Sequence, residues 1–253
     1  MNKKFKALII DVDGTLMASI RDGLPTTKVT EAIKKAAKIL HVGIATQRAI
    51  PNTIPIIKHL NLSSPSIVAG GALIIDSKTF KIIKEEVIEI DSLNKAIEIM
   101  KEYQKKYGVP FLVQDTEEGD KEWNEGYIPK RPFATFIGNL DLEIAKELED
   151  KLSKIPNIAV HKVTPWAGKF GVVVNAALAT KQHGIFEVAK ILGINTHEII
   201  GVGDGYNDFP LLMACGFKVA MGNAVSDLKE IADYIAPTVE NDGVADVINK
   251  FIL

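Results

Sequence analysis

The sequence predicts an α/β protein in which a parallel sheet forms one unit and a smaller α+β unit is inserted near the middle of the chain. The first observation behind this prediction is that short apolar runs, such as Ala7 to Ile10 and His197 to Val202, end abruptly at acidic residues or glycine. Parallel strands are buried on both faces, so α/β proteins place their polar sites at the carboxyl ends of the strands. The second observation is a change in the order of helix-like and strand-like segments between residues 82 and 164.

The first predicted strand, Ala7 to Ile10, leads into the sequence DVDGT, which contains Asp11 and Asp13. Both carboxylates are expected to point into one crevice, where each needs a cation or a proton. A calcium loop of the EF-hand type is excluded, because its sixth and twelfth positions would be Leu16 and Asp22 instead of glycine and glutamate. A simple Asp-Gly turn between two elements remains an open interpretation of this segment taken alone.

The second predicted strand of the core runs from His41 to Ala45 and is followed by Thr46, Gln47 and Arg48. A threonine hydroxyl at the end of a buried strand can donate a hydrogen bond to an anion. The alternative is that Thr46 is only the cap of the next helix.

The middle of the chain is predicted to form an α+β unit on one antiparallel sheet. Apolar positions in the first predicted helix, from Leu93 to Tyr103, recur with helical spacing and indicate a core face. Residues Asp115 to Gly126 form an acidic, turn-rich stretch. The predicted elements are the strand Ile82 to Ile90, the helix Asp91 to Tyr107, the strands Val109 to Val113 and Phe133 to Gly138, the helix Leu140 to Leu152 and the strand Ile158 to Val163.

A buried strand from Phe170 to Asn175 and a loop of small residues precede the next predicted helix, which runs to Leu192. Thr180 is predicted to be its N-cap and Lys181 its first residue. A cation at this position opposes the helix dipole by about 0.3–1 kcal/mol, so a bound phosphate or an aspartate pair is expected to compensate. An exposed lysine without a function remains the alternative.

The predicted strand His197 to Val202 is followed by GDGYND, which supplies Asp204, Asn207 and Asp208. A dinucleotide-binding glycine loop is a poor match, because Tyr206 stands where the third glycine is required and Asp204 would repel a pyrophosphate. A divalent cation would turn the same carboxylate into a ligand.

The four segments, taken in this order, resemble the motifs of the haloacid dehalogenase superfamily, and the insertion resembles the type II cap of its Cof-like subclass IIB phosphatases. The resemblance implies a Rossmann-like, doubly wound core formed by residues 1–81 and 165–253, with a cap domain at residues 82–164. It also implies a phosphoric monoester hydrolase. Two departures stand out: Gln47 replaces a glycine that is usual in the family, and Gly70-Gly71 replaces a frequent Asn-Gly.

The resemblance further implies a division of roles. Asp11 would be the nucleophile that forms an aspartyl phosphate, and Asp13 the general acid and base. Thr46 and Lys181 would complete the catalytic set by holding the phosphoryl oxygens. Mg²⁺ would be the cofactor, with Asp11, the backbone carbonyl of Asp13, Asp204 and Asp208 as its binding residues. The predicted substrate-binding residues are Thr15, Thr46, Gln47, Arg48, Lys181 and Asn207, with Lys130 and Arg131 in the cap. Trp123, Asn124 and Trp166 are further cap candidates, although packing is the usual role of a tryptophan and a solvated face that of a Lys-Arg pair.

The composition of the chain restricts the classes of partner and the compartment that are expected for it. The 253 residues carry a formal net charge of −2, which argues against a dominant nucleic-acid or anionic-membrane partner. No apolar stretch reaches membrane-spanning length, and the single cysteine, Cys215, favours a reducing cytoplasm. By resemblance the substrate is a small phosphomonoester of the sugar phosphate or phosphoglycolate type. A sugar phosphomutase and a non-enzymatic binding or regulatory protein remain the alternatives, and the sequence leaves the oligomeric state open.

Overall fold

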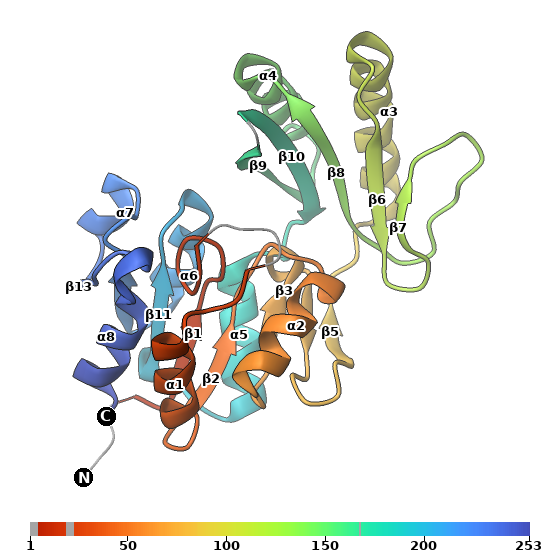
Figure 1. The fold of residues 1–253 in the computed structure, drawn as a ribbon. Helices are drawn as coiled ribbons and strands as arrows, with labels where there is room; N and C mark the ends of the chain where they lie inside the picture. The colour runs from red at the N-terminus through yellow and green to blue at the C-terminus, as the bar shows by residue number, and fades with distance from the viewer. Residues whose placement is uncertain (1–4, 19–22, 167) are drawn as a thin grey trace. The chain divides into compact units, whose positions relative to one another are not determined.

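The computed structural model describes residues 5–18, 23–166 and 168–253 and divides into two compact units. Residues 1–84 and 180–253 form the first unit, and residues 85–179 form the second. The second unit is therefore an insertion between two halves of the first (Figure 1).

The first unit is built on a five-stranded parallel sheet with the strand order β13-β12-β11-β1-β2. The strand β1, which lies between β11 and β2, is buried along its whole length. Ile10, the last residue of β1, lies opposite Val202 of β11 and Ile44 of β2, so the three strands end at nearly the same level. The five strands are β1 (Ala7–Ile10), β2 (His41–Ile44), β11 (Ile199–Gly203), β12 (Phe217–Ala220) and β13 (Tyr234–Ile235).

Helices cover both faces of this sheet. On one face α1 packs against α8, and on the other α5 packs against α6 (Figure 1). This arrangement confirms the predicted doubly wound, Rossmann-like core. The helices of the unit are α1 (Thr27–Ala36), α2 (Ile50–Leu60), α5 (Lys181–Leu192), α6 (Phe209–Ala214), α7 (Ser226–Glu230) and α8 (Gly243–Phe251).

A second, three-stranded sheet extends the first unit beside β2, with the order β3-β4-β5. The strands are β3 (Ser66–Val68), β4 (Leu73–Ile75) and β5 (Ile82–Glu85). A 3₁₀ turn, η1 (Ala69–Gly71), connects β3 to β4.

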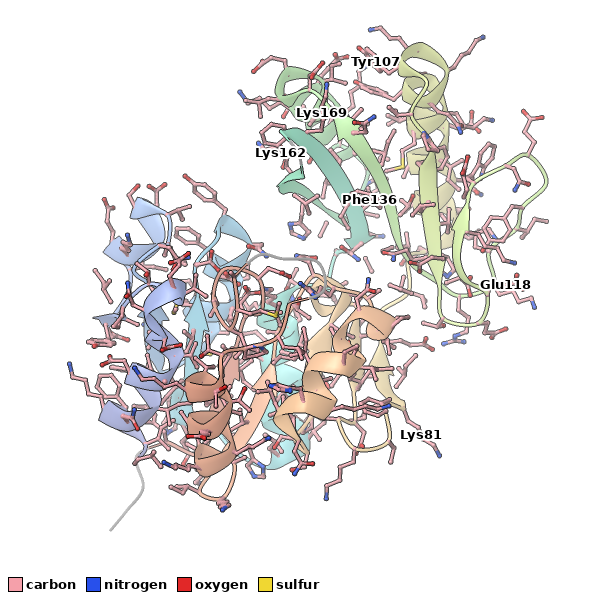
Figure 2. The ribbon with its side chains drawn as sticks, in the orientation of Figure 1. Lys81, Tyr107, Glu118, Phe136, Lys162 and Lys169 are labelled. Carbon is pink, nitrogen blue, oxygen red and sulfur yellow. The ribbon has the colours of Figure 1, made fainter. Side chains whose placement is uncertain are left out.

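The second unit is a five-stranded antiparallel sheet with the order β7-β6-β8-β10-β9 and two helices. Thr135 and Ile137 of β8 are fully buried, whereas Phe136, which points to the other face of the strand, is only partly buried (Figure 2). The predicted apolar positions of α3, from Leu93 to Tyr103, are buried as expected. The elements are α3 (Ile90–Tyr107), β6 (Phe111–Asp115), β7 (Gly119–Glu122), β8 (Pro132–Leu140), α4 (Leu142–Leu152), β9 (Ile158–Trp166) and β10 (Lys169–Ala176).

The structure differs from the sequence prediction at the limits of the inserted unit, which are 85–179 instead of 82–164. The strand predicted from Phe170 to Asn175 lies in β10, which pairs with β8 and β9 and so belongs to the inserted sheet. At the other limit, β5 joins the small sheet of the first unit. A buried β-branched strand fits either sheet, because only its pairing partners decide where it belongs.

Two local predictions are also corrected. The acidic stretch predicted as turns contains the exposed edge strand β7. The strand predicted to start at His197 begins at Ile199 instead, because residues Thr196–Glu198 form a 3₁₀ turn, η2, closed by a capping box between Asn195 and Glu198. Within the described ranges, the helices lack the combination of length and apolar character that crossing a membrane requires.

Candidate active site

The DVDGT loop begins where β1 ends. The Asp11 N–H donates to the Val202 carbonyl at 2.9 Å, and the Asp11 side chain is only 6% exposed. Gly14 has a φ of +86°, and a Cβ built on it would overlap the Asp204 carboxylate. The Asp-Gly turn is therefore present, but it also allows a second acidic segment to approach. The Thr15 hydroxyl donates to Asp204 Oδ1 at 2.6 Å.

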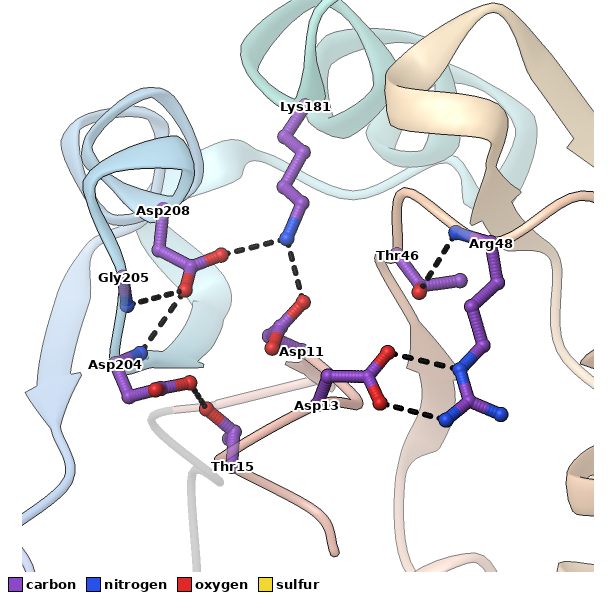
Figure 3. A network of polar contacts seen from close by, with 9 residues as sticks. All are labelled: Asp11, Asp13, Thr15, Thr46, Arg48, Lys181, Asp204, Gly205 and Asp208. Atoms are coloured by element: carbon purple, nitrogen blue, oxygen red, sulfur yellow. Dashed lines mark hydrogen bonds and ion pairs between the residues drawn. The ribbon is translucent and has the colours of Figure 1, made fainter. Parts of the chain in front are cut away.

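Lys181 lies in the centre of the site, at the N-terminus of α5 (Figure 3). Thr180 is the N-cap and its Oγ1 accepts the His183 N–H at 3.2 Å, as the sequence predicted. The Lys181 ammonium donates to Asp11 Oδ1 and to Asp208 Oδ1, both at 2.6 Å, and the side chain is 1% exposed. Two carboxylates thus compensate the buried cation that the helix dipole disfavours.

The pKa values of this centre reflect the burial of several charges together. Burial alone would lower the pKa of Lys181, but the charges of Asp11 and Asp208 outweigh it and raise that pKa above its usual value. Burial, together with the charge of Asp208, raises the pKa of Asp11 well above its ordinary range. Burial also raises the pKa of Asp204 to about 6, although the hydrogen bond from Thr15 acts in the opposite direction.

The sequence GDGYND folds as the end of β11 followed by a 3₁₀ turn, η3 (Tyr206–Asp208). Asp208 is fully buried, and its Oδ2 accepts the N–H groups of Asp204 at 2.9 Å and of Gly205 at 3.0 Å. These bonds fix the carboxylate, so its other oxygen faces Lys181. Asp208 therefore holds both the acidic loop and the lysine in place.

A divalent cation fits this donor set. Carboxylate oxygens of Asp11, Asp204 and Asp208 all lie within 4.8 Å of one another. Hard oxygen ligands of this kind suit Mg²⁺. In the network of Figure 3 the four carboxylates outnumber the cations Lys181 and Arg48 by two charges. After burial, the charge of the neighbouring Asp208 is a further cause of the raised pKa values of Asp11 and Asp204. The Asp13 carboxylate is not part of this cluster, and the binding of Mg²⁺ by the Asp13 backbone carbonyl stays a prediction.

The loop after β2 brings a second cation to the site. Thr46 is 1% exposed, and its Oγ1 accepts the Arg48 N–H at 3.1 Å. The guanidinium of Arg48 grips Asp13 with two bonds, from Nε to Oδ2 at 2.8 Å and from Nη2 to Oδ1 at 2.6 Å (Figure 3). The sequence placed Arg48 among the substrate-binding residues but did not foresee this pairing.

The remaining predicted residues fall into two groups. In the first unit, Gln47 lies against Gly70, and Asn207 lies against Gly205. In the second unit, Lys130 pairs with Glu118 at 2.8 Å and Arg131 pairs with Glu85. Their substrate-binding roles, like that of Thr15, stay predictions.

The structure describes contacts of two of the three additional cap candidates. Trp123 stacks on Phe111 with ring centroids 5.4 Å apart, which is a packing contact, and Asn124 donates to the Glu122 carbonyl at 3.4 Å. The side chain of Trp166 lies outside the described part of the structure.

One residue of the site was missed at the sequence level. The Asn223 amide donates to the Gly14 carbonyl at 2.8 Å, and its oxygen accepts the Val239 N–H at 2.9 Å. Asn223 follows β12, which ends three residues earlier at Ala220, and its side chain holds the DVDGT loop in place. Applying the strand-end rule to this strand as well would have drawn attention to it.

Comparison with known proteins agrees with this geometry. The family model of haloacid dehalogenase-like hydrolases matches residues 8–119 and 104–248. The 5-amino-6-(5-phospho-D-ribitylamino)uracil phosphatase YcsE of Bacillus subtilis is 29% identical, over 98% of this chain and 96% of that protein. Phosphoglycolate phosphatase 1 of Saccharolobus solfataricus is 24% identical, over 98% of this chain and 96% of that protein.

A solved structure is similar along almost its whole length. The subclass IIB sugar phosphatase BT4131 superimposes with a TM-score of 0.77 at 28% identity and covers 97% of this chain and 98% of that one. Together with the family model, these similarities show that the chain belongs to the haloacid dehalogenase-like hydrolase family and is one of its phosphatases.

Proposed function

We propose that the protein is a Mg²⁺-dependent phosphatase that hydrolyses small-molecule phosphomonoesters through an aspartyl-phosphate intermediate on Asp11. The observation that carries this proposal is the placement of Asp11, a buried carboxylate at the end of the buried strand β1 with Lys181 bonded to one oxygen. A nucleophile attacking an anionic ester needs this combination of fixed orientation and nearby positive charge.

Asp11 would attack the phosphorus atom, forming an Asp11–phosphate bond while the bond to the leaving oxygen breaks. Lys181 holds Asp11 in one orientation and offsets its charge. When bound, Mg²⁺ would neutralise phosphoryl charge, with Asp11, Asp204, Asp208 and the Asp13 carbonyl as the residues that hold it. Thr46 and Lys181 would donate to the nonbridging oxygens, because charge neutralisation and positioning supply most of the rate enhancement in phosphoryl transfer.

Asp13 is proposed to protonate the leaving oxygen and then to take a proton from the water that cleaves the intermediate. In the structure both of its oxygens are engaged by Arg48. A substrate phosphoryl group is also an anion that a guanidinium can grip with two bonds. We therefore propose that substrate binding draws Arg48 from Asp13 to the phosphoryl group, which frees the acid when it is needed.

The substrate class is proposed from the relatives. The names of YcsE, phosphoglycolate phosphatase 1 and BT4131 all refer to small phosphorylated molecules. Sugar phosphates and phosphoglycolate are therefore the first substrates to test. The second unit, with Lys130 and Arg131, is proposed to contact the leaving group and to exclude water. A cytoplasmic location, expected from the single cysteine, stays a prediction.

The proposal is tested by measuring phosphate release from p-nitrophenyl phosphate with Mg²⁺, with EDTA, and with Mg²⁺ restored. Activity should disappear with EDTA and return with Mg²⁺. Rapid quenching with ³²P-labelled substrate should trap a phosphoenzyme in the wild type and none in Asp11→Asn. Turnover that persists after chelation would refute the metal requirement, and turnover without a trappable intermediate would count against the covalent route. Isomerised sugar phosphate without free phosphate would identify a mutase instead.

A panel of phosphorylated metabolites, ranked by kcat/KM, would then identify the substrate class. The panel should include phosphoglycolate, several sugar phosphates and a phosphorylated ribitylamino compound. Equal, low values for every compound would show that the chosen classes are wrong.

A further inference from the structure

The turn Ala69–Gly71 has an unusual backbone for a buried segment. All three residues are buried and have positive φ angles, of +51°, +71° and +110°. Ala69 is not a glycine, so its left-handed conformation is strained and must be maintained by its surroundings. Such a turn connecting two short strands needs an explanation beyond a change of chain direction.

On one side the turn holds the loop that carries Thr46 and Arg48. The Gly70 N–H donates to the Thr46 carbonyl at 3.0 Å, and the Ala69 N–H donates to the Arg48 carbonyl at 2.9 Å. A Cβ built on Gly70 would overlap the end of the Gln47 side chain, so the amide of Gln47 occupies the space above this glycine. The turn therefore contacts each of the three residues from Thr46 to Arg48.

On the other side the turn contacts the start of α5. A Cβ built on Gly71 would overlap the backbone N, C and O atoms of Thr180, the N-cap. Backbone atoms cannot turn away as a side chain can. The next residue is Lys181, whose ammonium lies at 2.6 Å from two carboxylates. Any displacement of Thr180 is thus passed directly to the catalytic lysine.

We infer that the turn Ala69–Gly71 is a positioning element of the reaction, which fixes the Thr46–Arg48 loop and the N-terminus of α5 relative to each other. Neither glycine contacts the reacting atoms in this role. The inference rests on the proposed function, because Thr46 and Lys181 are the two groups proposed to hold the phosphoryl oxygens. Placement errors of about 1 Å in such groups can cost about 10²-fold in rate.

The decisive experiment compares Gly71→Ala with Gly193→Ala. Gly193 ends the same helix, has a φ of +66°, and has no atom near the position of an added Cβ. Both variants carry left-handed strain, but only Gly71→Ala displaces Thr180. With p-nitrophenyl phosphate and Mg²⁺, at a temperature where thermal unfolding shows both variants to be folded, kcat should fall about 10²-fold in Gly71→Ala and stay near wild type in Gly193→Ala.

Two readouts separate positioning from general destabilisation. The KM of Gly71→Ala should change much less than its kcat, and its affinity for orthovanadate, a transition-state analogue, should fall with kcat. If Gly71→Ala and Gly193→Ala have the same kcat, the inference is wrong. If the wild type itself releases no phosphate, the proposed function fails first, so the two failures are distinguishable.

Gly70→Ala provides a second variant in case Gly71→Ala does not fold. The added Cβ of this variant would meet the flexible end of the Gln47 side chain, which can move aside, so folding should be retained. We expect a fall in kcat of about tenfold, smaller than for Gly71→Ala because no backbone is displaced. In the double variant Gln47→Ala/Gly70→Ala, kcat should match that of Gln47→Ala alone, since the overlap is then gone. Wild-type kcat in Gly70→Ala would contradict the role of the turn.

Discussion

Lys181 in the first unit and Lys130 in the second are both paired with carboxylates, but in opposite environments. Lys181 is 1% exposed and lies between Asp11 and Asp208. The Lys130 side chain is 61% exposed and pairs with Glu118 at 2.8 Å. A buried ion pair cannot lose one partner without leaving an uncompensated charge, whereas an exposed pair exchanges its partner for water. The comparison shows that distance alone does not reveal which lysine the protein depends on.

The largest effect is expected from Asp11, the proposed nucleophile in the buried cluster. Asp11→Asn should lower kcat by at least about 10³-fold, because the amide cannot form an acyl phosphate. The fold should be retained, since Lys181 keeps its bond to Asp208. Steady-state phosphate release and far-UV circular dichroism check the two statements. Near-normal turnover in a folded Asp11→Asn protein would show that the nucleophile lies elsewhere.

Lys181→Met tests the buried pair itself. Removing the cation leaves two carboxylates facing each other, so we expect a loss of about 3–5 kcal/mol in the free energy of unfolding of the metal-free protein and almost no activity. Mg²⁺ should restore part of the stability, because it neutralises the same carboxylates. Urea denaturation with and without Mg²⁺ measures this. A variant as stable as the wild type would mean that the pair contributes nothing to folding.

Arg48→Lys should have an intermediate effect. The lysine keeps the charge but cannot form the two parallel bonds that we propose Arg48 makes to the substrate phosphoryl group, so KM should rise about tenfold with a smaller loss in kcat. The kinetic constants for p-nitrophenyl phosphate check this. A loss confined to kcat would instead indicate that Arg48 serves only to orient Asp13.

The pH dependence of metal stabilisation follows from Asp204. Its folded-state pKa of about 6 lies above the ordinary value of 3.8, so its contribution to stability is present at low pH and is lost as the pH rises through about 6. Metal-free protein should therefore lose stability between pH 4 and 7 through this group. The rise in Tm on adding Mg²⁺ should be about 2–4 °C larger at pH 7.5 than at pH 5, as scanning calorimetry can measure. An equal rise at both pH values would contradict this.

The smallest effect is expected from the exposed pair. Lys130→Ala should leave the Tm and the rate with p-nitrophenyl phosphate unchanged, because Glu118 is solvated by water and keeps its ion pair with Lys121. If Lys130 contacts the leaving group, KM for an acidic substrate such as phosphoglycolate should rise severalfold while p-nitrophenyl phosphate is unaffected. Unchanged KM for every substrate of the panel would remove Lys130 from the substrate-binding residues.

The sequence predicted the site best where chemistry is tied to the end of a strand. Asp11, Thr46 and Asp204 follow strands, and Lys181 begins a helix, each in a segment whose sequence pattern is strong. The structure brings these residues together (Figure 3). The sequence could not predict the bonds between Arg48 and Asp13 or the close contact between Gly71 and the Thr180 backbone. These contacts join segments that are far apart in the sequence, and a local sequence pattern carries no information about them. The limits of the second unit were misplaced for the same reason, because the sequence of β10 does not reveal that it pairs with β8 and β9.

The bond between Lys181 and Asp11 spans 170 residues of sequence. During synthesis, all of the second unit, residues 85–179, is made before Lys181, the lysine that partners Asp11. Closing so long a loop is costly in chain entropy and slow compared with the formation of local helices. The bond between Asp11 and Lys181 is therefore expected to form after the local structure of the inserted unit. Activity should accordingly appear late in refolding, after the secondary structure of both units has formed.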